Sequence, residues 1–220
     1  MFYGFANLVL RLFFYLLTRL EITGQENVPP AGSLMVVLNH VSFLDPPLLG
    51  VGVARRIRWM SKIENWNNPI MGAVLTLYGA FPVQRGEVDR KALVHALDIL
   101  RTGGALGIAP EGTRSRTGIL ARAKPGAARL AMQTDATILP VGIVGTELAV
   151  QAWRKLRRPL ISMHIGKPFK LAVGKPVSKE KQQELSDSMM LRIAELLPEA
   201  QRGVYGGGAE GLELADEVVR

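Results

Sequence analysis

The chain has 220 residues, of which 48% are apolar and 21% are charged, values typical of one folded domain and not of a disordered segment. It contains no cysteine, which excludes disulfides, cysteine-based zinc sites and a cysteine acyl-enzyme. The 27 Lys and Arg residues exceed the 19 Asp and Glu residues, and the net charge of +8 favours an anionic partner: nucleic acid, an anionic bilayer or a phosphorylated substrate.

The first 20 residues, MFYGFANLVLRLFFYLLTRL, predict a helix that is apolar apart from one narrow stripe. At about 100° per residue, the stripe contains Gly4, Asn7, Arg11 and Thr18. A central Arg costs about 2.5–3.5 kcal/mol in a spanning helix. We therefore expect residues 1–20 to lie in a membrane interface with the polar stripe towards water. A helix packed on the protein's own core and a spanning helix are the alternatives.

An apolar run at residues 34–38 predicts a buried strand that leads directly into a polar turn. His40 follows at the carboxyl end of this strand, where α/β sheets usually build their sites. Asp45 and Pro46 are a helix-start signal, with Asp45 as N-cap. Across this turn the Asp45 carboxylate can reach the imidazole, as in the base-and-orienter half of a catalytic triad. An ordinary hydrogen-bonded pair without catalytic role is the alternative.

The rest of the chain alternates short apolar strands with amphipathic helices, which predicts a single α/β domain with a mainly parallel, mixed sheet flanked by helices. The expected strands are residues 57–62, 80–86, 106–109, 137–144 and 160–165, and the expected helices are residues 46–56, 69–77, 88–101, 127–134 and 178–197. The domain is expected over residues 21–200, followed by a glycine-rich flexible tail at 201–220.

Two features are open to more than one interpretation. The basic segment 153–158 with its tryptophan suits lipid headgroups, or is a solvated loop. The three histidines have no metal-ligand spacing, and we interpret His95 and His164 as packing or surface residues. The sequence has no helix-turn-helix signature and no RNP-type aromatic strand, so nothing favours nucleic acid over the other anionic partners.

Polar residues follow the ends of several predicted strands, and parallel strands bring such residues to one edge of a sheet. The cations among them could hold a phosphate, which Arg binds bidentately and Lys binds as a compact charge. A turn containing Gly112 and Thr113 would add backbone N–H and hydroxyl donors. The candidate site residues are His40, Asp45, Lys62, Arg85, Glu111, Gly112, Thr113 and Arg114.

Four sequence blocks stand in order along the chain: NHVSFLD at 39–45, GAFPVQRG at 79–86, PEGTRS at 110–115 and ILPV at 138–141. With these blocks the sequence resembles the glycerolipid acyltransferases, and most of all the bacterial 1-acylglycerol-3-phosphate (lysophosphatidate) acyltransferases. The segments 62–64 and 124–126 match the family's intervening patterns, and the resemblance covers roughly residues 20–170. Ala109 stands where the family usually has Phe, a mild departure that changes none of the polar residues.

The resemblance implies an enzyme that moves a fatty acyl group from acyl-CoA or acyl carrier protein to the free hydroxyl of lysophosphatidate, which forms phosphatidate. His40 would accept the hydroxyl proton, and Asp45 would orient the ring. Lys62 or nearby N–H groups would stabilise the oxyanion. Family precedent places the acceptor phosphate near Arg85, Gly112, Thr113 and Arg114, and it gives Glu111 no role that we can derive.

The resemblance implies no cofactor beyond the acyl donor, and a monotopic or peripheral enzyme on the anionic cytoplasmic face of the inner membrane. Another lysophospholipid, glycerol 3-phosphate or a lyso-ornithine lipid could be the acceptor instead. A noncatalytic module that only binds anionic lipid is a further alternative, although phosphate binding alone needs neither His40 nor Asp45. Ser42 lacks the flanking glycines of a nucleophile elbow, so direct transfer is favoured over an acyl-enzyme. The sequence predicts no particular oligomeric state.

Overall fold

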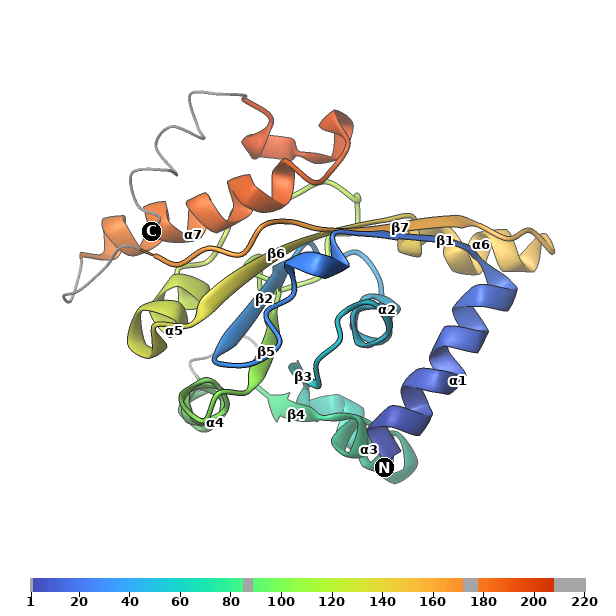
Figure 1. The fold of residues 1–220 in the computed structure, drawn as a ribbon, viewed down its shortest axis with the longest axis horizontal. Helices are drawn as coiled ribbons and strands as arrows, with labels where there is room; N and C mark the ends of the chain where they lie inside the picture. The colour runs from blue at the N-terminus through green and yellow to red at the C-terminus, as the bar shows by residue number, and fades with distance from the viewer. Residues whose placement is uncertain (1, 85–88, 172–177, 208–220) are drawn as a thin grey trace.

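The structure is a computed structural model that describes residues 2–84, 89–171 and 178–207. Its centre is a seven-stranded sheet with the strand order β1-β7-β6-β2-β5-β3-β4 (Figure 1). Strands β2 to β6 are parallel to one another, whereas β7 runs antiparallel to β6 and carries β1 parallel to itself. The strands are β1 Arg19–Thr23, β2 Leu34–Leu38, β3 Ile57–Lys62, β4 Ala80–Val83, β5 Ala105–Ile108, β6 Thr137–Val144 and β7 Leu160–Ile165.

This mainly parallel mixed sheet confirms the predicted α/β fold, and the bounds of β2, β3, β6 and β7 are the predicted ones. Strand β1 is different, because the sequence predicts one helix over residues 1–20. The helix ends at Leu17, and β1 begins at Arg19 and pairs with β7. The five residues of β1 are too few to stand out beside a long apolar helix, and their partner strand lies about 140 positions further along the chain.

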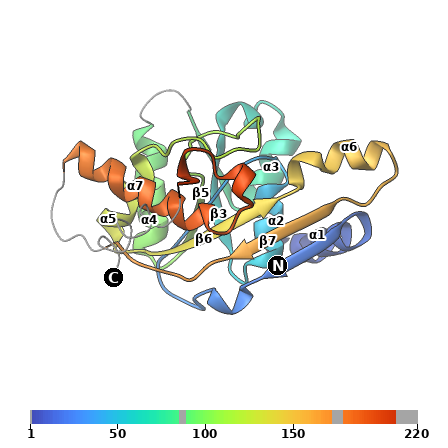
Figure 2. The same ribbon diagram turned by 90° about the horizontal axis from the view of Figure 1, so that it is seen from above.

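Helices cover both faces of the sheet (Figures 1 and 2). Helices α4, α5 and α7 pack on one face, where α7 crosses β6 and β2, and α2 lies on the other face with α1 and α3 outside it. The helices are α1 Phe2–Leu17, α2 Asp45–Gly52, α3 Pro69–Tyr78, α4 Arg90–Arg101, α5 Gly126–Thr134, α6 Ala149–Arg154 and α7 Lys179–Ala194.

The central strand β2 contributes side chains to the hydrophobic cores on both faces of the sheet. All five of its side chains are buried, and they alternate between the two layers. Met35 and Val37 pack with α4, α5 and α7, whereas Leu34, Val36 and Leu38 pack with α2 and Phe14 of α1. Full burial of such a side chain stabilises the fold by roughly 1.5–3 kcal/mol. The turn after β2 is therefore held on a rigid support.

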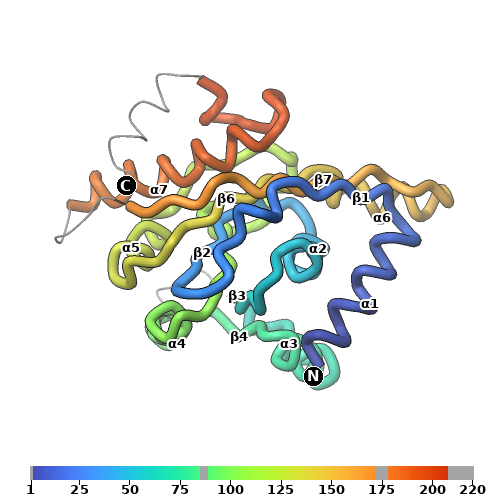
Figure 3. The backbone as a smooth tube through the Cα atoms, viewed as in Figure 1, coloured from blue at the N-terminus to red at the C-terminus, as the bar shows by residue number. Residues whose placement is uncertain are grey.

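Helix α1 is turned the other way round from the prediction. Side chains of its polar stripe bond to the protein, although Gly4 and Arg11 are exposed: Asn7 Oδ1 accepts a hydrogen bond from the Tyr78 hydroxyl at 2.7 Å, and Arg11 donates to the Val51 carbonyl oxygen at 3.3 Å. Thr18, just after the helix, is completely buried. The domain supplies hydrogen-bond partners for these polar side chains, so they need not face water. The start of α1 lies beside α3 (Figure 3).

The apolar surface of α1 is consequently exposed, and α3 continues it. Within the described residues, none of the helices has the length and apolar character that a membrane crossing needs. An exposed apolar patch of this kind marks a site of interaction with a protein or a membrane. We call it the apolar face, and its residues are Phe5, Leu8, Leu12, Tyr15 and Leu16 of α1 with Ile70, Met71, Val74 and Leu77 of α3.

The end of the domain also lies further along the chain than the predicted boundary at residue 201. Residues 199–201 and 203–205 form two turns of 3-10 helix. The Tyr205 ring is buried, and its hydroxyl donates to Asp187 at 2.6 Å and accepts from the Ala123 amide at 2.9 Å. The sequence predicts a flexible tail here because the segment is rich in glycine, and this composition does not reveal that Tyr205 is buried. The rest of the expected tail, residues 208–220, lies outside the described residues.

Candidate active site

His40 and Asp45 form the centre of the site. His40 Nδ1 donates to Asp45 Oδ2 over 2.7 Å, and the Asp45 side chain is completely buried. The same Oδ2 accepts from the amides of Val41 and Ser42, each at 2.8 Å. Oδ1 accepts from the Thr146 hydroxyl at 2.6 Å. A carboxylate with this many donors is fixed in place and holds the imidazole in one orientation.

Asp45 does not cap the following helix as the sequence suggests. Helix α2 begins at Asp45 itself, and the residue before it, Leu44, has no side-chain capping bond. The carboxylate turns back to the loop because three loop groups and Thr146 offer it hydrogen bonds there. Pro46 and Pro47 start the helix without a cap, since a proline in the first turn has no amide hydrogen to satisfy.

The bond to Asp45 determines which nitrogen of His40 is available. A buried carboxylate accepts, so Nδ1 carries the hydrogen and Nε2 keeps its lone pair. No described residue forms a hydrogen bond with Nε2, and the His40 side chain is 13% exposed. The ring therefore presents a basic nitrogen at the carboxyl edge of the parallel strands, which is the arrangement of a general base.

Asn39 fastens the start of this turn to the neighbouring strand. Its side-chain amide donates to the Ile143 carbonyl oxygen at 2.7 Å, and its Oδ1 accepts from the Ile143 amide at 2.8 Å. Asn39 is 1% exposed, so both bonds are shielded from water. The ladder between β2 and β6 ends at Leu38 and Val141, and these two side-chain bonds hold the chain against β6 just before His40.

Glu111 is a structural link rather than an open substrate contact. It is 3% exposed; Oε1 accepts from the His40 amide at 3.3 Å and Oε2 accepts from the Ala121 amide at 2.9 Å. Burial raises the pKa of Glu111 above its ordinary value, and the two backbone hydrogen bonds oppose that shift. Its observed contacts brace the backbone of His40, a role that no local sequence pattern indicates.

The turn after Glu111 lies against His40. The Ser115 amide donates to the His40 carbonyl oxygen at 2.7 Å. Gly112 has φ +72°, which favours glycine, and its amide donates to the Ala109 carbonyl oxygen at 2.9 Å. The expected donor at Gly112 is thus already used by the turn. A Cβ at Gly112 would lie 3.1 Å from Lys124 Nζ, so the Lys124 ammonium covers this turn.

Three of the four remaining predicted site residues lie at the same edge of the sheet as His40, and the fourth is not described. Thr113 and Arg114 are exposed on the turn beside His40. Lys62 ends β3 at the same edge, where its ammonium is paired with Glu64 at 2.8 Å. No described contact joins Lys62 to His40, so its part in the reaction stays a prediction. Arg85 lies outside the described residues.

Sequence reasoning missed three residues of the site: Asn39, Thr146 and Lys124. Asn39 carries a local signal, because it is a polar residue between a buried strand and His40. Thr146 carries none, since its partner Asp45 is 101 positions away. Lys124 lies in a segment that matches the family pattern but gives no indication of its target. Within residues 2–84, 89–171 and 178–207, no group of three or more His, Asp and Glu side chains is placed to hold a metal ion.

Comparison with known proteins identifies the family. A family model described as "Acyltransferase" matches residues 19–144, which is more than half of the chain and contains His40, Asp45 and the turn of Glu111. The chain belongs to the acyltransferase family. The predicted resemblance is confirmed at this level, and the protein is an acyltransferase enzyme.

Similar proteins carry more specific names. The chain is 28% identical over 196 residues to a 1-acyl-sn-glycerol-3-phosphate acyltransferase of Bacillus subtilis, which covers 88% of this chain and 96% of that protein. It is 31% identical over 130 residues to the protein of the same name from Borreliella burgdorferi, of which it spans 52%. The fold matches the crystal structure of the 1-acyl-sn-glycerophosphate acyltransferase PlsC of Thermotoga maritima with a TM-score of 0.68, 24% identity and coverage of 88% and 78% of the two chains.

Proposed function

We propose that this acyltransferase moves a fatty acyl group from an acyl thioester, carried by CoA or acyl carrier protein, to the free hydroxyl of 1-acylglycerol 3-phosphate. The product is phosphatidate, so the enzyme belongs to phospholipid biosynthesis. The observation that carries the proposal is the 2.7 Å bond between His40 Nδ1 and Asp45 Oδ2, which leaves Nε2 as a base beside a cationic turn.

The transfer is direct in this proposal. His40 Nε2 takes the proton of the acceptor hydroxyl while the hydroxyl oxygen attacks the thioester carbonyl carbon. The resulting tetrahedral intermediate expels the thiolate when its C–S bond breaks, and the His40 imidazolium returns the proton to the sulfur. Buried Asp45 stabilises the imidazolium between the two steps. Lys62 is the candidate donor to the developing oxyanion.

A serine acyl-enzyme is the competing route, and the local contacts favour direct transfer. The Ser42 hydroxyl accepts from the Leu44 amide at 3.2 Å, and its own amide donates to Asp45. No described hydrogen bond joins the Ser42 hydroxyl to His40, so the base is not positioned to activate it. A rapid burst of acyl-enzyme that disappears in Ser42→Ala would refute direct transfer.

The phosphate of the acceptor is proposed to bind at the turn that follows Glu111. Arg114 and Thr113 are exposed there, and Lys124 adds a second positive charge over Gly112. A guanidinium and an ammonium at one turn suit a phosphate monoester, because the first binds bidentately and the second supplies charge. Arg85, by family precedent, would complete the site.

Relatives support the acceptor without excluding others. The names of the Bacillus and Borreliella relatives specify 1-acylglycerol 3-phosphate. An N-acylphosphatidylethanolamine synthase of Arabidopsis thaliana is 28% identical over 166 residues, so another acceptor is the second candidate function. The same base and turn would serve a lysophospholipid, glycerol 3-phosphate or a lyso-ornithine lipid, and the acceptor is then chosen by the shape of the pocket.

We further propose that the apolar face of α1 and α3 lies in the membrane interface, on the anionic cytoplasmic side of the inner membrane. Helices that bury an apolar face at the level of the headgroups bind in proportion to the buried area. The basic segment 153–158, which suits lipid headgroups or is a solvated loop, bonds to the end of α1 through two of its side chains, and residues 154–157 are exposed. Trp153 donates to the Leu17 carbonyl oxygen at 2.8 Å, and Arg158 donates to the carbonyl oxygens of Tyr15 and Thr18.

The deciding experiment is a labelled-acyl transfer assay with purified protein, both thioester carriers and a panel of acceptors. We expect transfer to lysophosphatidate above the other acceptors. Arg114→Gln and Lys124→Gln should raise KM for the phosphorylated acceptor with a smaller change in kcat, and Arg129→Gln, exposed on α5, serves as the matched control. Preference for an acceptor without a phosphate monoester would contradict the proposal.

A further inference from the structure

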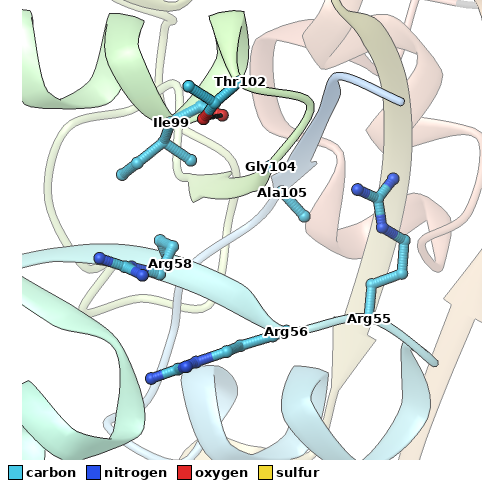
Figure 4. Close-up of a pocket in the computed structure, with 7 residues that line it drawn as sticks. All are labelled: Arg55, Arg56, Arg58, Ile99, Thr102, Gly104 and Ala105. Carbon is cyan, nitrogen blue, oxygen red and sulfur yellow. Dashed lines mark hydrogen bonds between the residues drawn. The ribbon is translucent and has the colours of Figure 1, made fainter. Parts of the chain in front are cut away.

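A cationic hollow of about 330 Å³ lies at the other end of the parallel strands from His40. Figure 4 shows the residues that line it. Arg55, Arg56 and Arg58 line it where the chain enters β3, and Thr102 and Ala105 line it where α4 gives way to β5. Strands β3 and β5 are parallel, so these residues mark their amino ends. The catalytic turn follows the carboxyl ends, and the two sites are therefore separate.

The three arginines of this hollow carry uncompensated charge. Among the described residues, none of them forms an ion pair with a carboxylate. Arg55 Nη1 and Arg58 Nε are buried without a hydrogen-bond partner. The remaining bonds go to backbone oxygens, from Arg55 to Gly103 at 2.9 Å and from Arg56 to Leu77 at 3.3 Å. Figure 4 shows the guanidinium of Arg55 on one side of the hollow and those of Arg56 and Arg58 on the other. Several cations around one hollow, with unused donors and no carboxylate partner, suit an anion.

The hollow is built onto the start of the apolar face. The Tyr3 hydroxyl of α1 donates to the Arg55 carbonyl oxygen at 3.2 Å and accepts from the Ile57 amide at 3.4 Å. The Arg56 guanidinium lies over the Tyr3 ring, 5.6 Å from its centre. Leu77, whose backbone accepts from Arg56, is 51% exposed at the end of α3. The arginines thus lie where two exposed apolar helices meet.

We propose that this hollow binds the phosphate group of a membrane phospholipid headgroup. The arginines contact the phosphate while the apolar face of α1 and α3 lies among the acyl chains. Arg recognises phosphate oxygens bidentately, and the adjoining apolar surface gives the lipid's chains a place that a free phosphate would not use. The lipid bound here is a docking ligand and not the acceptor. The inference rests on the membrane contact of the proposed function.

The test compares binding to two kinds of vesicle, phosphatidylcholine alone and phosphatidylcholine mixed with phosphatidylglycerol. The double variant Arg56→Gln/Arg58→Gln should lose on the order of tenfold in affinity for the anionic vesicles, given the attraction of each basic residue to an anionic surface. Its affinity for phosphatidylcholine should stay near wild type, which reports an intact fold and apolar face. The affinity of Arg58→Lys for the anionic vesicles should lie between those of wild type and the double variant, because lysine keeps the charge but not the bidentate geometry.

The matched control is Arg90→Gln/Lys91→Gln, which removes the same charge from exposed positions at the start of α4. An equal loss in this control would overturn the proposal, because net charge alone would then explain the effect.

Inorganic phosphate distinguishes the source of the ligand. Stabilisation of wild type by free phosphate, absent in Arg56→Gln/Arg58→Gln, would overturn a lipid-specific site. Acyl transfer in detergent micelles should be equal in all these variants. If wild type itself shows no acyl transfer in micelles, that result contradicts the proposed function, and the vesicle comparison still tests the lipid site.

Discussion

Glu111 holds the backbone of His40 from beneath: its Oε1 accepts from the His40 amide at 3.3 Å, and its Oε2 accepts from the Ala121 amide at 2.9 Å. One buried carboxylate therefore ties the turn of His40 to the loop that follows the turn at residues 112–115. Tyr205 holds the same loop by its bond to the Ala123 amide. The position of the base depends on these contacts as well as on Asp45.

Glu111→Gln should destabilise the protein by about 1–3 kcal/mol, because an amide group can accept from only one of the two buried N–H groups. Burial raises the pKa of Glu111 above 4.5, so the folded protein holds this proton to higher pH than the unfolded chain. The free energy of unfolding must then fall as pH rises through that range. Glutamine does not titrate, so the variant lacks this contribution to the pH dependence of the free energy of unfolding.

Denaturant titrations of wild type and Glu111→Gln at several pH values check the sign. The stability advantage of wild type should shrink as pH rises from 4.5 through the native pKa of Glu111. An advantage that grows over this range would mean that the backbone hydrogen bonds outweigh burial and lower the pKa of Glu111 instead of raising it. Glu111→Gln should retain far more transfer activity than a His40 substitution, since Glu111 contacts only backbone.

Asp45→Asn should reduce kcat on the order of 10²-fold or more, the range over which general-base catalysis contributes. The amide nitrogen of asparagine cannot accept from His40 Nδ1, Val41 or Ser42 if it takes the place of Oδ2. The imidazole would then turn or change its tautomer, and the pH profile of kcat should change with it. Binding of the acceptor is measured separately, and a large loss there with normal kcat would argue against an orienting role.

Thr146→Val removes the single hydroxyl that donates to Asp45 Oδ1 at 2.6 Å, with little change of shape. We expect a loss of about 1–2 kcal/mol in stability, measured by urea unfolding, and a reduction in kcat smaller than that of Asp45→Asn. Thr146→Ser, which keeps the hydroxyl, should recover most of the activity. Activity near wild type in the valine variant with a loss in the serine variant would show that the methyl group, and not the bond, matters.

The apolar face is tested by replacing Leu8, Leu12 and Leu16 together with glutamine. All three are more than half exposed, so the fold should be kept, as a circular dichroism spectrum and melting temperature would report. Each leucine buried in an interface contributes roughly 1.5–3 kcal/mol, and the triple variant should release the protein from vesicles. Val94→Gln and Val204→Gln are controls at exposed apolar positions away from this face. Unchanged vesicle binding in the triple variant would place the docking surface elsewhere.

Six of the seven strands were predictable because each is a short apolar run between turn residues, as β2, β6 and β7 illustrate, whereas β1 was missed. The orientation of α1 was not, since periodicity separates a polar stripe from an apolar one without saying which is covered. The partners Tyr78 and Val51 decide that, and they are far along the chain.

The site divides in the same way. His40 and Asp45 are five positions apart, so a local turn signal was enough to pair them. Glu111 and Thr146 reach this turn only through the β2–β5 and β2–β6 pairings, and no local pattern encodes those contacts. The use of the Gly112 amide by its own turn is likewise a matter of backbone geometry.

The most direct measurement is labelled-acyl transfer to lysophosphatidate by His40→Ala beside wild type, with vesicle binding of both proteins recorded in the same preparation. Loss of the base should lower kcat on the order of 10²–10⁴-fold, while vesicle binding stays near wild type. Transfer by His40→Ala at a rate close to wild type, or an equal loss of transfer and of vesicle binding, would contradict the assignment of His40 as the general base.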